Sequence, residues 1–239
     1  MASGSKGMGA IIPNVLTASN LLLGFFSIVS TLHNRYDLAA MFVVGAAVAD
    51  TLDGRAARYF NVSSDFGKEL DSLCDLGSFG VAPAALAYSF LLADLGWMGA
   101  FAAAFFAVCG AMRLARFNVN TTKVKGYFMG LPIPAGGCLV STFAMLGVKP
   151  APWTFGLAVA IVGYLMISTI HYPDFKGQGE PVNKVAAILA FAGGAWCLFV
   201  NPKSYLFAPF FGYALLGVIS FFLRLVIPGR SDPKPDGSL

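Results

Sequence analysis

The chain has 239 residues, of which 57% are hydrophobic and only 12% are charged, and its mean hydropathy is +0.71. A soluble domain carries about 25% charged residues, so this composition excludes an ordinary soluble protein and indicates one that is largely embedded in a membrane. The net charge of +4 does not indicate a nucleic-acid-binding protein, because the basic residues are spread through short loops between apolar segments.

Eight apolar segments follow one another along the chain, each close to the roughly 20 residues that cross a bilayer as a helix. They predict an all-α integral membrane protein with about eight transmembrane helices. These helices form a single catalytic domain over residues 14–227, between an N-terminal tail (1–13) and a disordered polar tail (228–239). The predicted spans are 14–32, 38–59, 66–93, 96–117, 132–148, 153–170, 183–200 and 204–227.

Lysine and arginine residues are divided unequally between the two sides of these spans. The side that includes both termini holds thirteen of them, and the other side holds only Arg35, Lys149 and Lys203. Basic residues concentrate in the cytoplasmic loops of membrane proteins. We therefore expect a multi-pass cell-membrane protein with both termini, and the acidic segment described next, on the cytoplasmic side.

The second and third spans contain a concentration of acidic residues. Residues 50–75 hold six of the twelve Asp and Glu residues of the chain. Asp50 and Asp53 are three residues apart, and Asp71 and Asp75 are four apart, so each pair lies on one face of its helix. Carboxylates that meet in this way repel one another unless cations neutralise them. We therefore predict a site for two divalent metal ions between the two helices.

The depth of this site bears on its function. Asp50 follows Leu38 by twelve residues, which is about 18 Å of helix, so it should lie inside the cytoplasmic leaflet. An uncompensated carboxylate is costly there and should face a polar cavity. A site at this depth suits an enzyme that acts on both a membrane lipid and a water-soluble molecule.

The acids belong to a longer motif, Asp-x-x-Asp-Gly-x-x-Ala-Arg, eight residues, Gly-x-x-x-Asp-x-x-x-Asp, over residues 50–75. With every specified position present, the chain resembles the CDP-alcohol phosphotransferase family. The resemblance implies the fold of that family, a homodimer, and two Mg²⁺ or Mn²⁺ ions. It also implies that Asp71 and Asp75 are catalytic, with Asp75 as the general base. The implied metal ligands are Asp50, Asp53, Asp71 and Asp75.

The resemblance further implies a site for the CDP group of a lipid. Small residues in the motif would let the nucleotide approach the backbone, and Arg58 would bind a phosphate through its planar guanidinium group. Asn14 and Thr17 share a face of the first span and would contact the CDP group, although capping and interhelical hydrogen bonding explain them equally well. The implied nucleotide-binding residues are Asn14, Thr17, Gly54, Ala57, Arg58 and Gly67.

Basic residues at the end of the fourth span suggest where the acceptor alcohol binds. Arg113 and Arg116 share a helical face and would bind a carboxylate or phosphate, with anchoring at the membrane surface as the alternative. The segments 113–118, 130–134 and 172–176 resemble the phosphatidylserine synthase branch of the family, which implies CDP-diacylglycerol and L-serine as substrates. The implied acceptor-binding residues are Arg113, Arg116, Asn118, Lys123 and Lys125.

Two other functions remain open at this point. An acceptor such as glycerol 3-phosphate or inositol phosphate carries a phosphate dianion and should require more cationic groups. A cation-coupled transporter would also use buried carboxylates, but it gives no reason for Gly54, Ala57 and Gly67 at these spacings.

Overall fold

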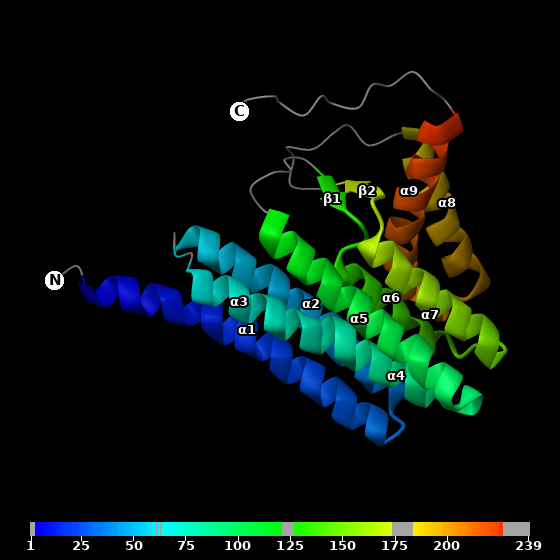
Figure 1. The fold of residues 1–239 in the computed structure, drawn as a ribbon, viewed down its shortest axis with the longest axis horizontal. Helices are drawn as coiled ribbons and strands as arrows, with labels where there is room; N and C mark the ends of the chain where they lie inside the picture. Colours follow the sequence, from blue (N-terminus) through cyan, green and yellow to red (C-terminus); the bar gives the residue numbers. More distant parts are fainter. Residues whose placement is uncertain (1–2, 61, 63, 121–126, 174–183, 227–239) are drawn as a thin grey trace.

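The structure is a computed structural model of the whole chain, and it describes residues 3–60, 62, 64–120, 127–173 and 184–226. Helices dominate these residues, and one small two-stranded sheet lies at one end of the bundle (Figure 1). The helices are α1 (Ser3–Leu32), α2 (Tyr36–Tyr59), α3 (Asp65–Asp75), α4 (Ala82–Phe90), α5 (Trp97–Asn120), α6 (Ile133–Phe143), α7 (Pro152–Ile167), α8 (Lys184–Val200) and α9 (Phe207–Val226).

These helices coincide with the predicted spans. Among the described residues, three helical segments are long and apolar enough to cross a membrane, namely Ile12–Leu32, Asp65–Phe90 and Trp97–Val119. Shorter apolar helices follow them, whereas α2, the second predicted span, is in neither group. Large apolar side chains such as Phe101 and Phe191 point outward, as expected where lipid surrounds the protein. The chain is therefore a multi-pass membrane protein. Its α1 begins at Ser3 and so runs through the predicted N-terminal tail.

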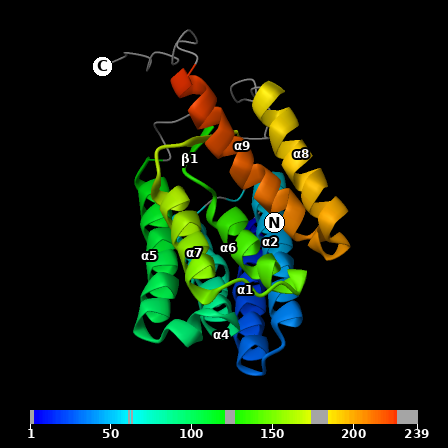
Figure 2. The same cartoon turned by 90° about the vertical axis from the view of Figure 1, so that its right-hand side faces the viewer.

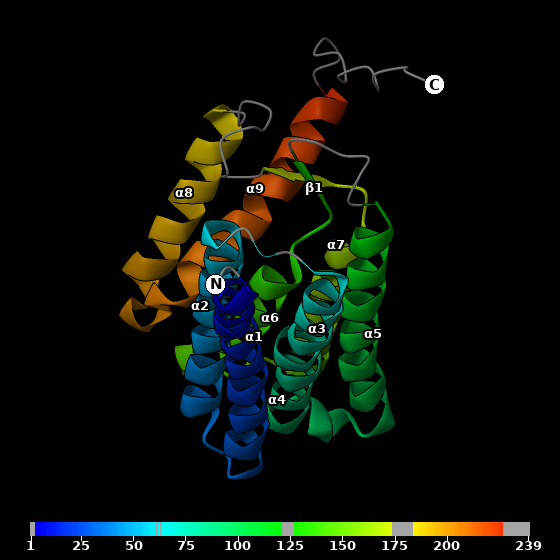
Figure 3. The same cartoon turned by 90° about the vertical axis from the view of Figure 1, so that its left-hand side faces the viewer.

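The third span is one helical column of three parts. A π-helical segment, Leu76–Val81, joins α3 to α4, and Figure 3 shows α3 and α4 end to end between α1 and α5. This segment contacts α1 closely, because a Cβ atom on Gly24 would lie 2.7 Å from the Cα atom of Ser78. The Ser78 hydroxyl also donates to the main-chain oxygen of Asn20 (2.9 Å). These contacts fix α3, and the acids that it carries, against α1.

The C-terminal hairpin of α8 and α9 lies on one flank of the bundle (Figure 2). The helix α9 packs on α6 and on α8, and α6 lies between α7 and α9. A 3₁₀ turn, Pro202–Tyr205, connects the two helices of the hairpin. The side chain of Asn201 donates to the main-chain oxygen of Leu146 (2.8 Å) and so ties this turn to the end of α6.

The small sheet was not predicted. Its strands β1 (Tyr127–Met129) and β2 (His171–Pro173) pair antiparallel, with Phe128 opposite Tyr172. Gly130 follows β1 with φ of +77°, and a side chain there would collide with the main-chain oxygen of Met166. The sheet thus joins the segment before α6 to the segment after α7, near the cytoplasmic end predicted for α5.

Candidate active site and metal centre

Three of the predicted acids meet between α2 and α3. One carboxylate oxygen of each of Asp50, Asp53 and Asp71 lies within 4.8 Å of the other two. Asp53 is buried, with 5% of its surface exposed, and Asp50 and Asp71 are half-buried. The three-residue spacing within α2 puts its two acids on one helical face, from which their carboxylates meet that of Asp71 on α3.

This cluster fits a divalent cation. Oxygen ligands lie about 2.0–2.6 Å from Mg²⁺ or Ca²⁺, so oxygens that share one ion lie up to roughly 5 Å apart. The Oδ1 atom of Asp71 is buried and, among the described residues, has no hydrogen-bonding partner. A buried carboxylate oxygen with no donor is costly, and a cation at the cluster would remove that cost. The residues present therefore match a metal centre built from hard oxygen ligands.

The first helix supports an acid on each of its two neighbours. The Thr17 hydroxyl donates to Oδ2 of Asp53 (2.7 Å), and the side-chain amide of Asn20 donates to Oδ1 of Asp75 (2.9 Å). Thr17 and Asn20 are themselves buried and lie three residues apart on one face of α1. Asn20 was missed by the sequence prediction, although an amide one turn after Thr17 in an apolar span was a usable signal.

Asp75 stands apart from the cluster of three. It lies one turn beyond Asp71 on α3 and is 7% exposed. Its electrostatic neighbours are Asp50, Asp71 and Asp53, yet the group of oxygens within 4.8 Å does not include it. Its roles as a ligand of a second ion and as the general base stay predictions.

The predicted nucleotide-binding residues come together in two places beside the acids. Asn14 on α1 reaches Gly67 at the start of α3, where a Cβ atom would lie 3.8 Å from the Asn14 Oδ1 atom. Ser64 caps α3 by accepting from the Gly67 N–H (3.0 Å). On α2, Arg58 folds back, so that its Nη1 atom would lie 3.7 Å from a Cβ atom on Gly54. At each glycine the absence of a side chain lets a ligand approach the main chain, beside Asn14 at Gly67 and beside Arg58 at Gly54.

Ala57 is half-buried on α2, and it adds no polar atom to this region. It lies one turn after Gly54 on the same helical face, and its small side chain leaves space for a ligand beside that face.

Arg113 is the buried cation of the site. It is 7% exposed, and its Nε atom has no hydrogen-bonding partner among the described residues. Its guanidinium carbon lies 5.9 Å from the ring centre of Phe117, and Asp75 and Tyr213 are electrostatic neighbours. A buried guanidinium group is costly without a paired anion, so this arrangement suits an anionic ligand close to Asp75.

Arg116 has a different environment. Its Nη1 atom donates to the main-chain oxygen of Ile167 (3.0 Å), and its Nη2 atom donates to those of Ser168 (3.0 Å) and Met129 (3.3 Å). The two terminal nitrogens therefore hold β1 against the end of α7. These contacts give Arg116 a structural role that the sequence prediction, which placed it with the acceptor, did not foresee.

Asn118 also has a partner within the protein. Its amide donates to the Ser72 hydroxyl (2.9 Å), which ties the end of α5 to α3 next to Asp71. Lys123 and Lys125, the remaining predicted acceptor residues, lie outside the described residues.

The sequence profile of the CDP-alcohol phosphatidyltransferase family matches residues 10–196. The chain belongs to this family. The matched region contains the whole acidic motif, most of α1 and all of α2 to α7, whereas α9 follows it. The acids between α2 and α3 therefore lie inside the region that this chain shares with the family.

Members of the family with related names are similar to this chain over most of its length. It is 36% identical over 224 residues to the CDP-diacylglycerol–serine O-phosphatidyltransferase of Helicobacter pylori, covering 90% of this chain and 93% of the relative. The protein of the same name from Bacillus subtilis is 40% identical over 166 residues, or 69% of this chain and 91% of the relative. The archaetidylserine synthase of Methanothermobacter thermautotrophicus is 36% identical over 170 residues, 70% and 72% of the two chains.

Proposed function

We propose that this protein transfers the phosphatidyl group of CDP-diacylglycerol to the hydroxyl group of L-serine, which gives phosphatidylserine and CMP. The observation that carries the proposal is the similarity over 90% of the chain to a relative named for this reaction. The cluster of Asp50, Asp53 and Asp71 agrees with it, because transfer from a pyrophosphate requires that negative charge be neutralised.

The acids divide the work of binding the cations. Asp50, Asp53 and Asp71 hold one divalent ion, and Asp75 joins Asp71 at a second. Mg²⁺ and Mn²⁺ both suit these oxygen ligands. When bound, the ions neutralise the pyrophosphate of the donor lipid and the charge that develops on departing CMP.

Asp75 is the general base in this proposal. It takes the proton of the serine hydroxyl while the serine oxygen forms a bond to the lipid-linked phosphorus. The bond from this phosphorus to the CMP oxygen breaks, and its electron pair leaves with CMP. Because Asn20 already donates to Oδ1 of Asp75, the carboxylate is held in one orientation, with Oδ2 as the proton acceptor.

The nucleotide binds beside the acids, against α1, α2 and the start of α3. Gly54 and Gly67 let the CDP group approach the main chain, Arg58 binds a phosphate, and Asn14 contacts the cytidine. Thr17 acts through Asp53, to which it donates, and Ala57 provides clearance on the same face as Gly54.

Arg113 binds the carboxylate of serine. Its burial and its position near Asp75 support a site in which the base reaches the hydroxyl group of the bound amino acid. Arg116 and Asn118 support this pocket from behind through their contacts with Ser168 and Ser72. Lys123 and Lys125, which lie outside the described residues, stay predicted acceptor-binding residues.

Purified protein in lipid vesicles tests the proposal directly. With CDP-diacylglycerol and labelled L-serine, we expect labelled phosphatidylserine and an equal amount of CMP. Labelled product from glycerol 3-phosphate or inositol phosphate, with none from serine, would refute the choice of acceptor. Ion flux without CMP release would indicate a transporter instead.

The similarity to an archaetidylserine synthase favours a second donor for the same reaction. CDP-archaeol presents the same headgroup, so we include it beside CDP-diacylglycerol in the assay. The ratio of the two rates then identifies the lipid backbone that the protein prefers.

The membrane topology and the assembly are part of the proposal. Eight spans with both termini in the cytoplasm agree with the thirteen basic residues on the side of the acids, and family resemblance supports a homodimer. Labelling of single cysteines from each side of intact cells tests the topology, and light scattering in detergent tests the dimer.

A further inference from the structure

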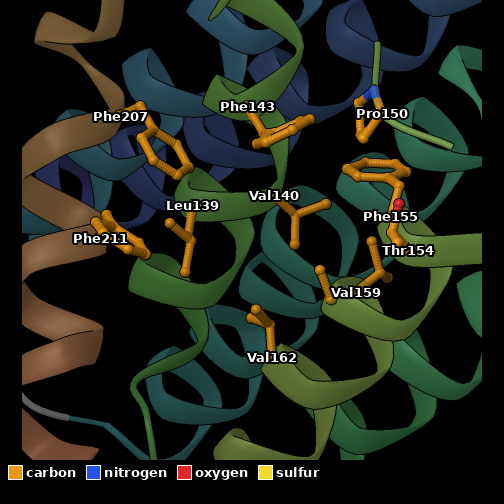
Figure 4. A pocket seen from close by; sticks show the side chains of 11 residues that line it. Leu139, Val140, Phe143, Pro150, Thr154, Phe155, Val159, Val162, Phe207 and Phe211 are labelled. Atoms are coloured by element: carbon orange, nitrogen blue, oxygen red, sulfur yellow. The ribbon is translucent and has the colours of Figure 1, made fainter. Parts of the chain in front are cut away.

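An apolar groove lies at the end of the bundle opposite the acids. It has a volume of about 320 Å³ and lies between α6, α7 and the beginning of α9. In Figure 4 the side chains of Leu139 and Val140 form its floor, with Val159 on one wall and Phe207 and Phe211 on the other. Since α6 lies between α7 and α9 (Figure 2), the groove runs along α6. All three helices belong to predicted membrane spans, so the groove lies in the membrane-embedded part of the protein.

The lining of the groove selects an apolar ligand. Among the described residues that line it, Thr154 alone has a polar side chain, and the Thr154 hydroxyl already donates to the main-chain oxygen of Ala151 (2.6 Å). Phe143 stacks on Phe155 (5.1 Å between ring centres) and meets Phe207 edge-on (5.9 Å). The side chains offer no group that would recognise a sugar, a nucleotide or a peptide, whereas a hydrocarbon chain satisfies them.

Two lysines flank the end of the groove at the membrane surface. Lys149 precedes Pro150, a lining residue, and Lys203 lies in the turn just before Phe207, another lining residue. Both are exposed. The hydrogen bond from Asn201 to Leu146 joins the two loops that carry them. The sequence assigns only three basic residues to this side of the membrane, and two of the three stand at this groove.

We propose that the groove binds one acyl chain of an anionic phospholipid from the leaflet opposite the acids, with the lipid phosphate held between Lys149 and Lys203. The apolar lining takes the chain, and the two ammonium groups attract the phosphate at the height of the headgroups. This second lipid site is separate from the donor site, because α6 begins on the side of the acids and ends at the groove.

The charge at this end favours a lipid over a second copy of the protein. A symmetric contact between two copies brings the same patch of each together. Centred on this groove, it would place the lysine pairs of both copies beside one another, and like charges at an interface disfavour association.

The test uses the full chain in nanodiscs of phosphatidylcholine that contain phosphatidylglycerol with a photoreactive acyl chain. Mass spectrometry then locates the labelled residues after illumination. Labelling of the groove residues of α6, α7 and α9 is expected in the native protein. Ala158→Phe fills the groove, and a double variant, Lys149→Gln with Lys203→Gln, removes the phosphate contact. Each should reduce this labelling on the order of tenfold.

Two matched variants serve as controls. Ala104→Phe adds the same ring to an exposed position of α5, and Arg35→Gln removes the third cation of this side, which is neither a lining residue of the groove nor adjacent to one in the sequence. Both should leave the labelling of the groove unchanged. Size-exclusion profiles and melting temperatures confirm that all four variants are folded.

Several results would overturn the proposal. One is labelling of the groove that is equal in Ala158→Phe and Ala104→Phe. Another is equal labelling by a photoreactive diacylglycerol, which lacks the phosphate. Displacement of the label by excess CDP-diacylglycerol would mean that the groove holds the tail of the donor lipid. Conversion of a dimer to monomers by Ala158→Phe would make it a protein interface.

Discussion

The two ends of the helix bundle treat polar groups in opposite ways. Between α2 and α3, acids are buried and held by polar side chains of α1, such as Thr17 and Asn20. At the groove between α6, α7 and α9, the interior is apolar and the charges, Lys149 and Lys203, are exposed at the rim. A charge inside a membrane protein needs a partner, so the first arrangement suits ions and headgroups, whereas the second suits hydrocarbon.

Substitution of one of the clustered acids should have the largest effect. Asp71→Asn keeps the size of the side chain but removes a charged ligand from the cluster, so CMP release should fall on the order of a thousandfold. The control is Asp65→Asn, which changes a fully exposed acid paired with Lys68 on the same helix. It should leave the rate unchanged. Full activity of Asp71→Asn, or of the native protein in excess chelator, would contradict the metal assignment.

The polar support from α1 should matter next. Thr17→Val removes the donor to Asp53 at almost constant volume, so the concentration of Mn²⁺ required for half-maximal activity should rise roughly 10- to 100-fold. Thr17→Ser retains the hydroxyl and should restore the native value. If both variants require the same Mn²⁺ concentration, the hydroxyl does not position Asp53.

Arg113 distinguishes acceptor binding from packing. Arg113→Lys retains the charge but loses the planar pair of donors. We expect the KM for serine to rise about tenfold, which corresponds to about 1.4 kcal/mol, with the KM for CDP-diacylglycerol unchanged. An equal rise in both constants would remove Arg113 from the serine site.

Arg116 should have the smallest effect on specificity. Arg116→Ala removes the donors to the main-chain oxygens of Ile167, Ser168 and Met129. A hydrogen bond from a charged group contributes about 1.5–3 kcal/mol to the stability of the fold. The melting temperature should therefore fall, and the use of both substrates should weaken together. Selective loss of serine use in a protein of native stability would return Arg116 to the acceptor site.

The sequence predicted the helices and the acidic cluster because both follow from local spacing. An apolar segment of about 20 residues predicts a membrane-spanning helix whatever its neighbours in the fold. Acids three or four residues apart on a helix share a face. The meeting of Asp50, Asp53 and Asp71 required only that α2 and α3 be neighbours, which the short connection between them favours.

Contacts between distant segments could not be predicted in this way. Strands β1 and β2 have three residues each and form only by pairing with one another, and no local pattern marks so short a strand. Arg116 was predicted to bind the acceptor because it shares a helical face with Arg113, and that role stays a prediction. Its contacts with main-chain oxygens of α7 and β1 could not be predicted, because main-chain oxygens have no signature in the sequence. The π-helical turn at Leu76–Val81 also depends on packing against α1.

The position of α1 sets a requirement on the enzyme that the acids alone do not reveal. It touches Asp53 on one neighbour and Asp75 on the other through residues only one turn apart. Turning α1 about its axis by a single residue, roughly 100°, would withdraw both donors together. A variant with all four aspartates in place but one residue inserted between Asn20 and Gly24, where the contact with Ser78 anchors the helix, would therefore assemble in the membrane without a working centre.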